Sequence, residues 1–215
     1  MGGTGPQGKG LGYRFARHGH SVVVGSRAAE KAEVVAEEIR ARLDGVDGAG
    51  EVSGAANADA CAEADIVVLA VPWDGHDDLV GSLPLAGKTV VSCVNPLAFD
   101  KRGAHGLVID AGEGSAAERA QALAPEATVV GAFHNVSAVV LLDESVASVD
   151  CDVLVLGEVR EATDTVIALA SRIAGVRGIF GGRLRNAAQI ESLTANIIAI
   201  NRRYKTHASI SITGL

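Results

Sequence analysis

Three glycines near the start of the chain stand where a main chain can hold a pyrophosphate. Gly3, Gly5 and Gly8 have G-x-G-x-x-G spacing, and residues 8–17 continue with helical apolar periodicity. The first glycine of this pattern permits a tight turn, the second lets a pyrophosphate approach, and the third lets the helix pack closely. The helix N-terminus then offers N–H groups to the phosphates. A glycine-rich surface turn is equally compatible with the spacing alone, because the chain has 26 glycines.

The segment that follows predicts which dinucleotide is bound. Residues 21–24 are strand-like, and they end in Gly25-Ser26-Arg27, with Lys31 one helical turn further on. An NAD site needs an Asp or Glu at this point, and none is present. A hydroxyl, a guanidinium and an ammonium suit a 2′-phosphate, so the sequence favours NADP. The alternative is that both cations are solvated, although a helix start disfavours positive charge.

The apolar strand that usually precedes such a glycine turn is not part of this sequence. The glycines begin one residue after Met1, whereas a strand of about five residues is expected before them. Either the sequence starts downstream of the true start of the protein, or the fold manages without the strand. We favour the first, because a central parallel strand buried on both faces is hard to omit.

Composition indicates an ordinary globular protein. The 215 residues are enough for one large domain, or for one domain with a small appendage, and they are 48% hydrophobic and 21% charged. A net charge of −7 gives no general attraction to nucleic acid. No apolar run is long enough to span a membrane, and Cys61, Cys93 and Cys151 lack disulfide or metal-site spacing. We expect a cytoplasmic protein with reduced cysteines and no metal site.

Apolar runs and turn signals alternate along the rest of the chain, which predicts an α/β fold with a doubly wound, mostly parallel sheet of the Rossmann type. The last helix is apolar on one face, so a homodimer is expected, and the tail after it should dock near a site or across the dimer. We divide the chain into a dinucleotide-binding domain, 1–182, and a C-terminal helix and tail, 183–215. Strands are predicted at 51–53, 66–71, 89–94, 128–133, 151–156 and 177–180, and helices at 28–43, 57–64 (capped by Asn57), 115–123 (opened by a Ser115–Glu118 capping box), 161–173 and 184–203.

Loops at the carboxyl ends of the predicted strands supply further candidate residues. Val71-Pro72-Trp73 follows one strand, and His134 follows another, so both should reach the edge where doubly wound sheets bind ligands. Trp73 is equally compatible with a hydrophobic lid, and His134 with a buried, hydrogen-bonded structural histidine. His76 is expected to be a surface helix residue, and residues 100–106 a polar loop that covers a ligand or is simply solvated.

Several short motifs follow one another along the chain. They are Gly2-Gly3-Thr4-Gly5 with Gly8-Lys9-Gly10, Val24-Gly25-Ser26-Arg27 with Lys31-Ala32-Glu33, Val71-Pro72-Trp73, Ser115-Ala116-Ala117-Glu118, Phe133-His134, and Arg185-Asn186 with Glu191-Ser192-Leu193-Thr194. Taken in this order, they resemble the NADPH-dependent coenzyme F420 reductases. The resemblance covers almost the whole chain, and the Gly-Ser-Arg segment, the Pro-Trp loop and the late Glu-Ser-Leu-Thr helix are its more specific parts.

The resemblance implies hydride transfer between NADP(H) and the 8-hydroxy-5-deazaflavin of coenzyme F420, a reaction that needs stacking and orientation rather than a catalytic side chain. Asn135 and Ser137 depart from the more apolar family pattern. The implied NADP contacts are Thr4, Gly5, Pro6 and Gln7 at the pyrophosphate, beside Gly3 and Gly8, and Ser26, Arg27 and Lys31 at the 2′-phosphate; Val71, Pro72, Trp73, His134 and Ala138 line the stacked rings, and Ile210 contacts the deazaflavin.

Two other functions remain open from the residues. One is an NADPH-dependent reductase of flavin or of a metal ion, although related domains of that kind accompany membrane segments, which this sequence lacks. The other is an NADP-binding regulatory protein without activity. Turnover with the deazaflavin, turnover with flavin only, or binding without turnover distinguishes the three.

Overall fold

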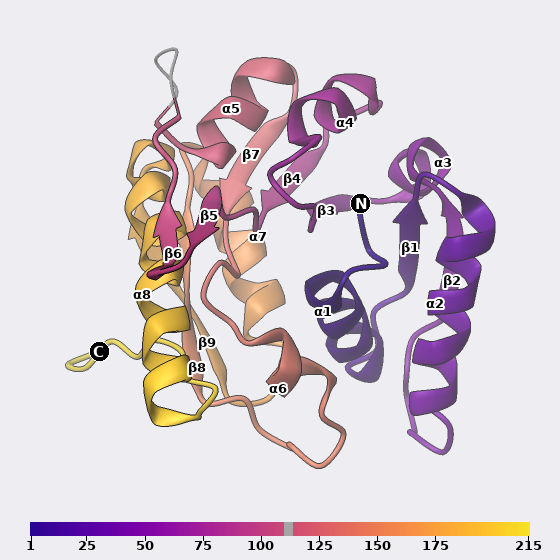
Figure 1. The fold of residues 1–215 in the computed structure, drawn as a ribbon. Coiled ribbons are helices and arrows are strands. Elements are labelled where there is room, and N and C mark those ends of the chain that lie inside the picture. The colour runs from indigo at the N-terminus through magenta and orange to yellow at the C-terminus, as the bar shows by residue number, and fades with distance from the viewer. Residues whose placement is uncertain (110–113) are drawn as a thin grey trace.

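The computed structural model describes residues 1–109 and 114–215, and it confirms the α/β fold (Figure 1). The first part, which we call the N-terminal lobe (residues 1–63), contains a two-stranded parallel sheet and three helices. Its strands are β1 (Val22–Ser26) and β2 (Val52–Ala56), and its helices are α1 (Pro6–Arg17), α2 (Ala29–Arg42) and α3 (Asn57–Glu63).

A second, five-stranded sheet, the main sheet, has the strand order β3-β4-β7-β8-β9. Its neighbours are parallel except β7 and β8, which are antiparallel and meet at one residue pair, so the prediction of a mostly parallel sheet is correct. The strands are β3 (Ile66–Leu69), β4 (Thr89–Ser92), β7 (Thr128–Gly131), β8 (Cys151–Leu156) and β9 (Val176–Gly182).

Helices cover both faces of the main sheet, as expected for strands that are apolar on both sides. Leu11 and Phe15 of α1 pack with Val130 on one face, while Ala117 packs with Val129 on the other. In the described residues no helix has the length and hydropathy needed to cross a bilayer. The helices are α4 (His76–Ser82), α5 (Ala116–Leu123), α6 (Ala138–Leu142), α7 (Arg160–Ala170) and α8 (Ala187–Tyr204), with a 3₁₀ turn, Leu184–Asn186, before α8.

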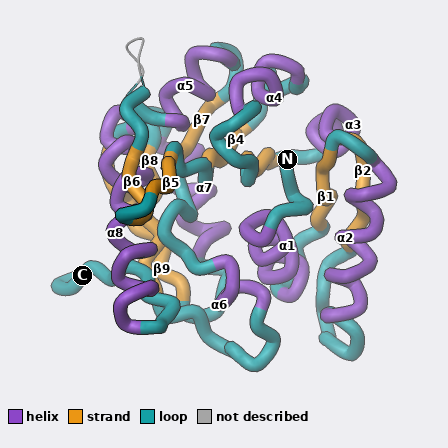
Figure 2. The backbone as a smooth tube through the Cα atoms, viewed as in Figure 1, coloured by secondary structure: helices purple, strands orange, loops and turns teal. Residues whose placement is uncertain are grey.

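The segment 100–106, expected to be a polar loop, forms most of an antiparallel hairpin of β5 (Leu97–Asp100) and β6 (Gly103–Gly106). The hairpin lies beside α8 (Figure 2), where a Cβ on Gly106 would come within 2.9 Å of Ser192 Oγ. The side chain of Asp100 accepts hydrogen bonds from the Arg102 and Gly103 amides and so closes the turn. The loop prediction was wrong because weakly apolar strands of four residues carry little sequence signal.

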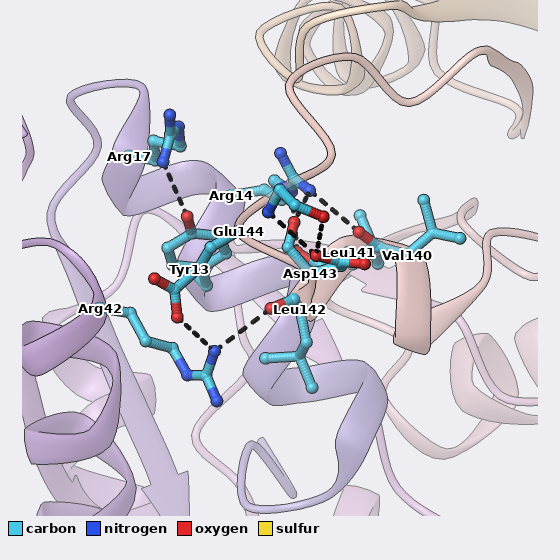
Figure 3. Close-up of polar contacts among 10 residues, drawn as sticks. Tyr13, Arg14, Arg17, Arg42, Val140, Leu141, Leu142, Asp143 and Glu144 are labelled. Carbon is cyan, nitrogen blue, oxygen red and sulfur yellow. Dashed lines mark hydrogen bonds and ion pairs between the residues drawn. The ribbon is translucent and has the colours of Figure 1, made fainter.

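The N-terminal lobe and the main sheet are joined mainly through α1 and α6 (Figure 3). Arg14 of α1 is only 1% exposed. Its guanidinium donates to the carbonyls of Val140 and Leu141 in the last turn of α6, and to those of Asp143 and Val146 in the segment that follows, at 2.8–2.9 Å. A cation is well placed here, because the last carbonyls of a helix have no partner within it. Arg42 of α2 adds contacts to Leu142 and Glu144.

Candidate functional site

The glycine turn closes as its spacing predicts. Gly2 has φ +64°, and the Gly3 amide donates to the Gly25 carbonyl of β1 at 3.0 Å. A Cβ on Gly8 would lie 2.6 Å from Gly3 Cα, so any other residue would push α1 off the turn. A Cβ on Gly5 would meet no atom closer than 3.8 Å. The turn is therefore tight at Gly3 and Gly8 and open at Gly5, which is where a pyrophosphate needs access.

Helix α1 begins directly at this opening. Gly5 is its N-cap, Pro6 occupies the first turn, and no acidic side chain lies there. The first-turn amides have no carbonyl within the helix, so they remain available to an anion. Thr4 is half-buried and Pro6 exposed, while Gln7 Nε2 donates to the Phe133 carbonyl at 3.3 Å. Gln7 thus ties the glycine turn to the residue before His134.

The end of β1 carries the cations predicted to meet a 2′-phosphate. Ser26 is buried, and its hydroxyl accepts from the Ala28 amide at 3.4 Å. Arg27 and Lys31 are exposed, and neither forms an ion pair within the described residues. Close in sequence to the buried Ser26 hydroxyl stand two cations without an ion pair in the described residues, and β1 carries no carboxylate; hydroxyl, guanidinium and ammonium are donors that suit a phosphate dianion.

Asn57 lies next to this strand end, in a position that the sequence did not assign to the site. It was predicted to cap α3, but the N-cap is Ala56, and Asn57 is the first helical residue. Its Oδ1 is buried and has no hydrogen-bond partner in residues 1–109 and 114–215, and a Cβ on Gly25 would come within 2.9 Å of it. A buried acceptor without a partner is costly, so a donor on a bound ribose or adenine fits this atom.

The loop after β3 approaches the glycine turn from the main sheet. Val71 is half-buried, and a Cβ on Gly2 would lie 2.2 Å from its Cγ1. Pro72 is exposed, and the half-buried ring of Trp73 lies 5.1 Å from the ring of His76. His76 is 1% exposed, so the expectation of a surface residue was wrong. The Trp73 ring covers His76, and the Nδ1 atom of His76 pairs with Asp77 Oδ1 at 2.9 Å.

His134 lies just beyond β7 and is buried. Its backbone carbonyl accepts from Asn95 Nδ2 and Thr194 Oγ1 at 3.0 and 3.2 Å, but neither ring nitrogen has a partner within the described residues. Burial lowers the pKa of His134 to about 4, so the ring is neutral at pH 7. The burial expected of a structural histidine is confirmed, while within the described residues no hydrogen bond to the ring accompanies it.

The last two candidates lie on different elements. Ala138 opens α6, which packs so closely on α1 that a Cβ on Gly10 would lie 2.7 Å from Leu141 Cβ. Ile210 is half-buried in the tail, and its carbonyl accepts from the Asp152 amide of β8 at 2.9 Å. The tail therefore docks on its own chain. Contacts join the glycine turn to Gly25, Val71 and Phe133, whereas none joins it to Ile210 in the part of the chain that the structure describes.

Comparison with known proteins bears directly on this arrangement. Residues 1–96 match the family model described as NADP oxidoreductase, coenzyme F420-dependent. The F420-dependent NADP reductase of Methanothermobacter thermautotrophicus is 41% identical, over all of this chain and 94% of the relative. That of Methanocaldococcus jannaschii is 38% identical, over all of this chain and 97% of the relative. The chain belongs to the family of F420-dependent NADP reductases. The resemblance seen in the sequence is thereby confirmed.

The fold agrees with this family. A crystal structure from Arthrobacter sp. FB24, assigned as an F420-dependent NADP reductase, superposes with a TM-score of 0.78 at 27% identity. The alignment covers 98% of this chain and 96% of the other. The α/β framework that presents the glycine turn and the loops after β3 and β7 is therefore a framework of F420-dependent NADP reductases.

Two residues that sequence reasoning missed hold the loop after β7 in this family member. Asn95 supports His134 as described, and Asn135 Nδ2 donates to Thr194 Oγ1 and to the Ile190 carbonyl of α8, at 2.9 and 3.2 Å. The Asn135 carbonyl in turn accepts from Ser209 Oγ at 2.8 Å. A signal was available for Asn95, because it directly follows the strand predicted at 89–94, where polar side chains reach the ligand edge. Asn57 follows β2 as the structure has it, but the strand was predicted to end at residue 53, so its place at the ligand edge was missed.

Proposed function

We propose that this protein transfers a hydride between NADP(H) and coenzyme F420. The observation that carries the proposal is the 38–41% identity with F420-dependent NADP reductases over the whole chain. The glycine turn with Ser26, Arg27 and Lys31 supports it independently, because these residues favour NADP chemistry before any relative is considered.

NADP(H) binds along the edge that runs from β1 across the turn to β3. Gly3, Thr4, Gly5, Pro6, Gln7 and Gly8 hold the pyrophosphate, and the opening at Gly5 together with the free first-turn amides supports this role. Ser26, Arg27 and Lys31 hold the 2′-phosphate, in keeping with the absence of any ion pair to either cation within the described residues. Asn57 Oδ1 accepts a hydrogen bond from the adenosine part of the nucleotide, which would give this buried oxygen a partner.

The two reacting rings meet near the loops after β3 and β7. Val71, Pro72, Trp73, His134 and Ala138 line this place, and Ile210 contacts the deazaflavin from the tail. Hydride transfer between a nicotinamide and a deazaflavin supplies its own chemistry, so the protein contributes proximity, orientation and exclusion of water. A neutral His134 suits this role, since its ring presents no charge to the hydride acceptor.

The decisive experiment is a spectrophotometric assay of the purified protein with oxidised F420 and NADPH, which follows the loss of deazaflavin absorbance. NADH with F420, and NADPH with FMN, serve as controls. We expect rapid loss with NADPH and F420 only. Turnover with FMN but not F420 would replace the proposal by a flavin reductase. NADPH binding without turnover, in protein shown to be folded by circular dichroism, would replace it by a regulatory role.

We further propose that the protein is a cytoplasmic homodimer whose C-terminal part, residues 183–215, forms the contact. Ile200 and Tyr204 of α8 are 42% and 72% exposed, which supports a partner on this helix. The three buried, free cysteines suit a reducing compartment. Light scattering after gel filtration tests the dimer, and Tyr204→Glu should convert it to monomer without unfolding it.

A further inference from the structure

The loop after β7 is held in place through its main chain. Residues 133–135 each present a carbonyl that accepts a hydrogen bond from a side chain of another element. The donors are Gln7 of α1 to Phe133, Asn95 and Thr194 to His134, and Ser209 of the tail to Asn135, at 2.8–3.3 Å. Phe133 has φ +63°, a conformation that bulky residues rarely adopt. Because this backbone is strained, the surrounding contacts must keep the loop in position.

The tail, residues 205–215, bridges this loop and strand β8. Strands β7 and β8 are antiparallel and meet at one residue pair, and continuing its register places Asn135 level with Asp152. The tail joins these two residues. Ser209 Oγ donates to the Asn135 carbonyl at 2.8 Å, and the carbonyl of the next residue, Ile210, accepts from the Asp152 amide at 2.9 Å. Two consecutive tail residues thus connect the loop after β7 to β8.

Asp152 also anchors the tail beyond Ile210. Its carboxylate, 1% exposed, accepts from the Ile212 amide and, at 2.6 and 2.8 Å, from Nε and Nη2 of Arg177 on β9. Arg177 Nη2 also donates to the Ile212 carbonyl at 2.8 Å. We call Asp152, Arg177 and Ile212 the latch. A guanidinium that meets a carboxylate at two points fixes its geometry, so the latch holds the tail residues before it in one position.

We propose that the tail positions the loop after β7 for hydride transfer, with Ser209 as the positioning residue and the latch as its anchor. This role rests on the proposed function, which places His134 beside the two reacting rings. Ser209 acts through the main chain of Asn135, the residue that follows His134. A misplacement of about 1 Å in a group that orients the reactants can cost on the order of 100-fold in rate, so one hydrogen bond at this point matters.

This role separates the two halves of the site. The glycine turn closes onto β1 through the Gly3 amide, and the Ser209 hydroxyl donates to the loop after β7 instead. Loss of the Ser209 hydroxyl should therefore slow hydride transfer without weakening NADPH binding. A residue that served stability alone would lower Tm but leave the rate of the folded molecules unchanged.

The first test compares Ser209→Ala with Ser211→Ala. Ser211 is exposed, and its hydroxyl makes no hydrogen bond within the residues that the structure describes, so it is the matched control. Stopped-flow absorbance measures the single-turnover rate of hydride transfer from NADPH to F420, and isothermal titration measures NADPH affinity. We expect Ser209→Ala to slow the transfer by roughly tenfold at unchanged NADPH affinity. Ser209→Thr, which keeps the hydroxyl, should restore most of the rate, and Ser211→Ala should match wild type.

The second test weakens the latch. Asp152→Asn removes the buried charge, and Asp150→Asn is the control, because Asp150 is exposed and accepts from the Ser148 hydroxyl at 2.9 Å. We expect Asp152→Asn alone to slow hydride transfer and to speed amide hydrogen exchange at Ile212 by roughly tenfold or more, as the tail opens more often. Circular dichroism checks that both variants are folded.

Two outcomes of these assays would overturn the proposal. One is a wild-type transfer rate in both Ser209→Ala and Asp152→Asn. The other is a loss of NADPH affinity that matches the loss of rate, since the tail would then support the whole fold.

A wild-type protein that does not turn over F420 would overturn the proposed function, and the NMR signals of the His134 ring would then decide the role of the tail. A shift of these signals in Ser209→Ala but not in Ser211→Ala would support the positioning of the loop by the tail. Unchanged signals in both variants would overturn it.

Discussion

Two buried charges hold helix ends in this molecule, and they do so with opposite sign. Arg14 donates to the terminal carbonyls of α6 and joins the N-terminal lobe to the main sheet. Glu191 of α8 accepts from the Ala116 and Ala117 amides at the start of α5, at 2.9 and 3.1 Å. Each charge matches the helix end that it contacts, because free carbonyls attract a cation and free amides an anion.

The two contacts differ in how they respond to pH. Burial lowers the pKa of Arg14 below its ordinary value, yet a guanidinium stays charged throughout the physiological range. Burial raises the pKa of Glu191 to about 7, against the pull of its two amide donors. The contact between lobe and sheet is therefore constant in charge, whereas the contact between α5 and α8 titrates near neutrality.

The largest effect is expected from removing the charge of Arg14. Arg14→Met fills similar space but leaves four carbonyls without their donor, so the free energy of unfolding should fall by roughly 4 kcal/mol. Urea denaturation measures this loss. Arg17→Met is the control, because Arg17 donates only to the Tyr13 hydroxyl in the described residues and should cost about 1 kcal/mol or less. Equal losses in both variants would show that the α1–α6 contact rests on apolar packing alone.

Glu191 should make stability depend on pH. Its pKa is higher in the folded protein than the ordinary 4.5, so the folded state binds the proton more tightly between pH 4.5 and 7. The free energy of unfolding should therefore fall as pH rises through this window, by about 3 kcal/mol from this group. Denaturation of wild type and Glu191→Gln at pH 5 and pH 8 isolates the contribution.

The glutamine variant should lose most of this pH dependence, although it is less stable at pH 5 because one amide donor faces an NH₂ group. Glu161→Gln, an exposed position on α7, is the matched control and should keep the wild-type slope. A glutamine variant with the wild-type slope would assign the pH dependence to other groups.

Much of this architecture follows from local sequence pattern. The glycine turn, the strand ending in Ser26 and the Ser115 capping box form as predicted, with Ser115 Oγ accepting from the Glu118 amide at 3.0 Å. These features depend on residues a few positions apart. Arg14 and Glu191 were beyond prediction, because their partners lie more than 70 residues away and nothing local distinguishes a buried charge from a solvated one. His76 was misplaced for the same reason, since Trp73 covers it only in the folded chain.

Another cation of the N-terminal lobe, Arg27, sharpens the contrast with Arg14. Arg27 lies in the same lobe but is exposed and forms no ion pair within the described residues, so it is expected to serve a ligand rather than the fold. Arg27→Ala should leave stability within about 0.5 kcal/mol of wild type. It should weaken NADPH binding by roughly 10- to 150-fold, since a charge-assisted contact contributes on the order of 1.5–3 kcal/mol. Isothermal titration with NADPH and NADH measures both affinities.

NADH binding should change little in this variant, because NADH has no 2′-phosphate for the guanidinium to contact. Arg160→Ala removes an exposed arginine at the start of α7, whose one ion pair among the described residues is with Asp164 at 3.5 Å, and it should alter neither nucleotide affinity. Equal losses for NADPH and NADH would move Arg27 from the 2′-phosphate to a part common to both nucleotides. A large loss of stability would instead give Arg27 a structural role like that of Arg14, and the distinction between cations for the fold and cations for the ligand would fail.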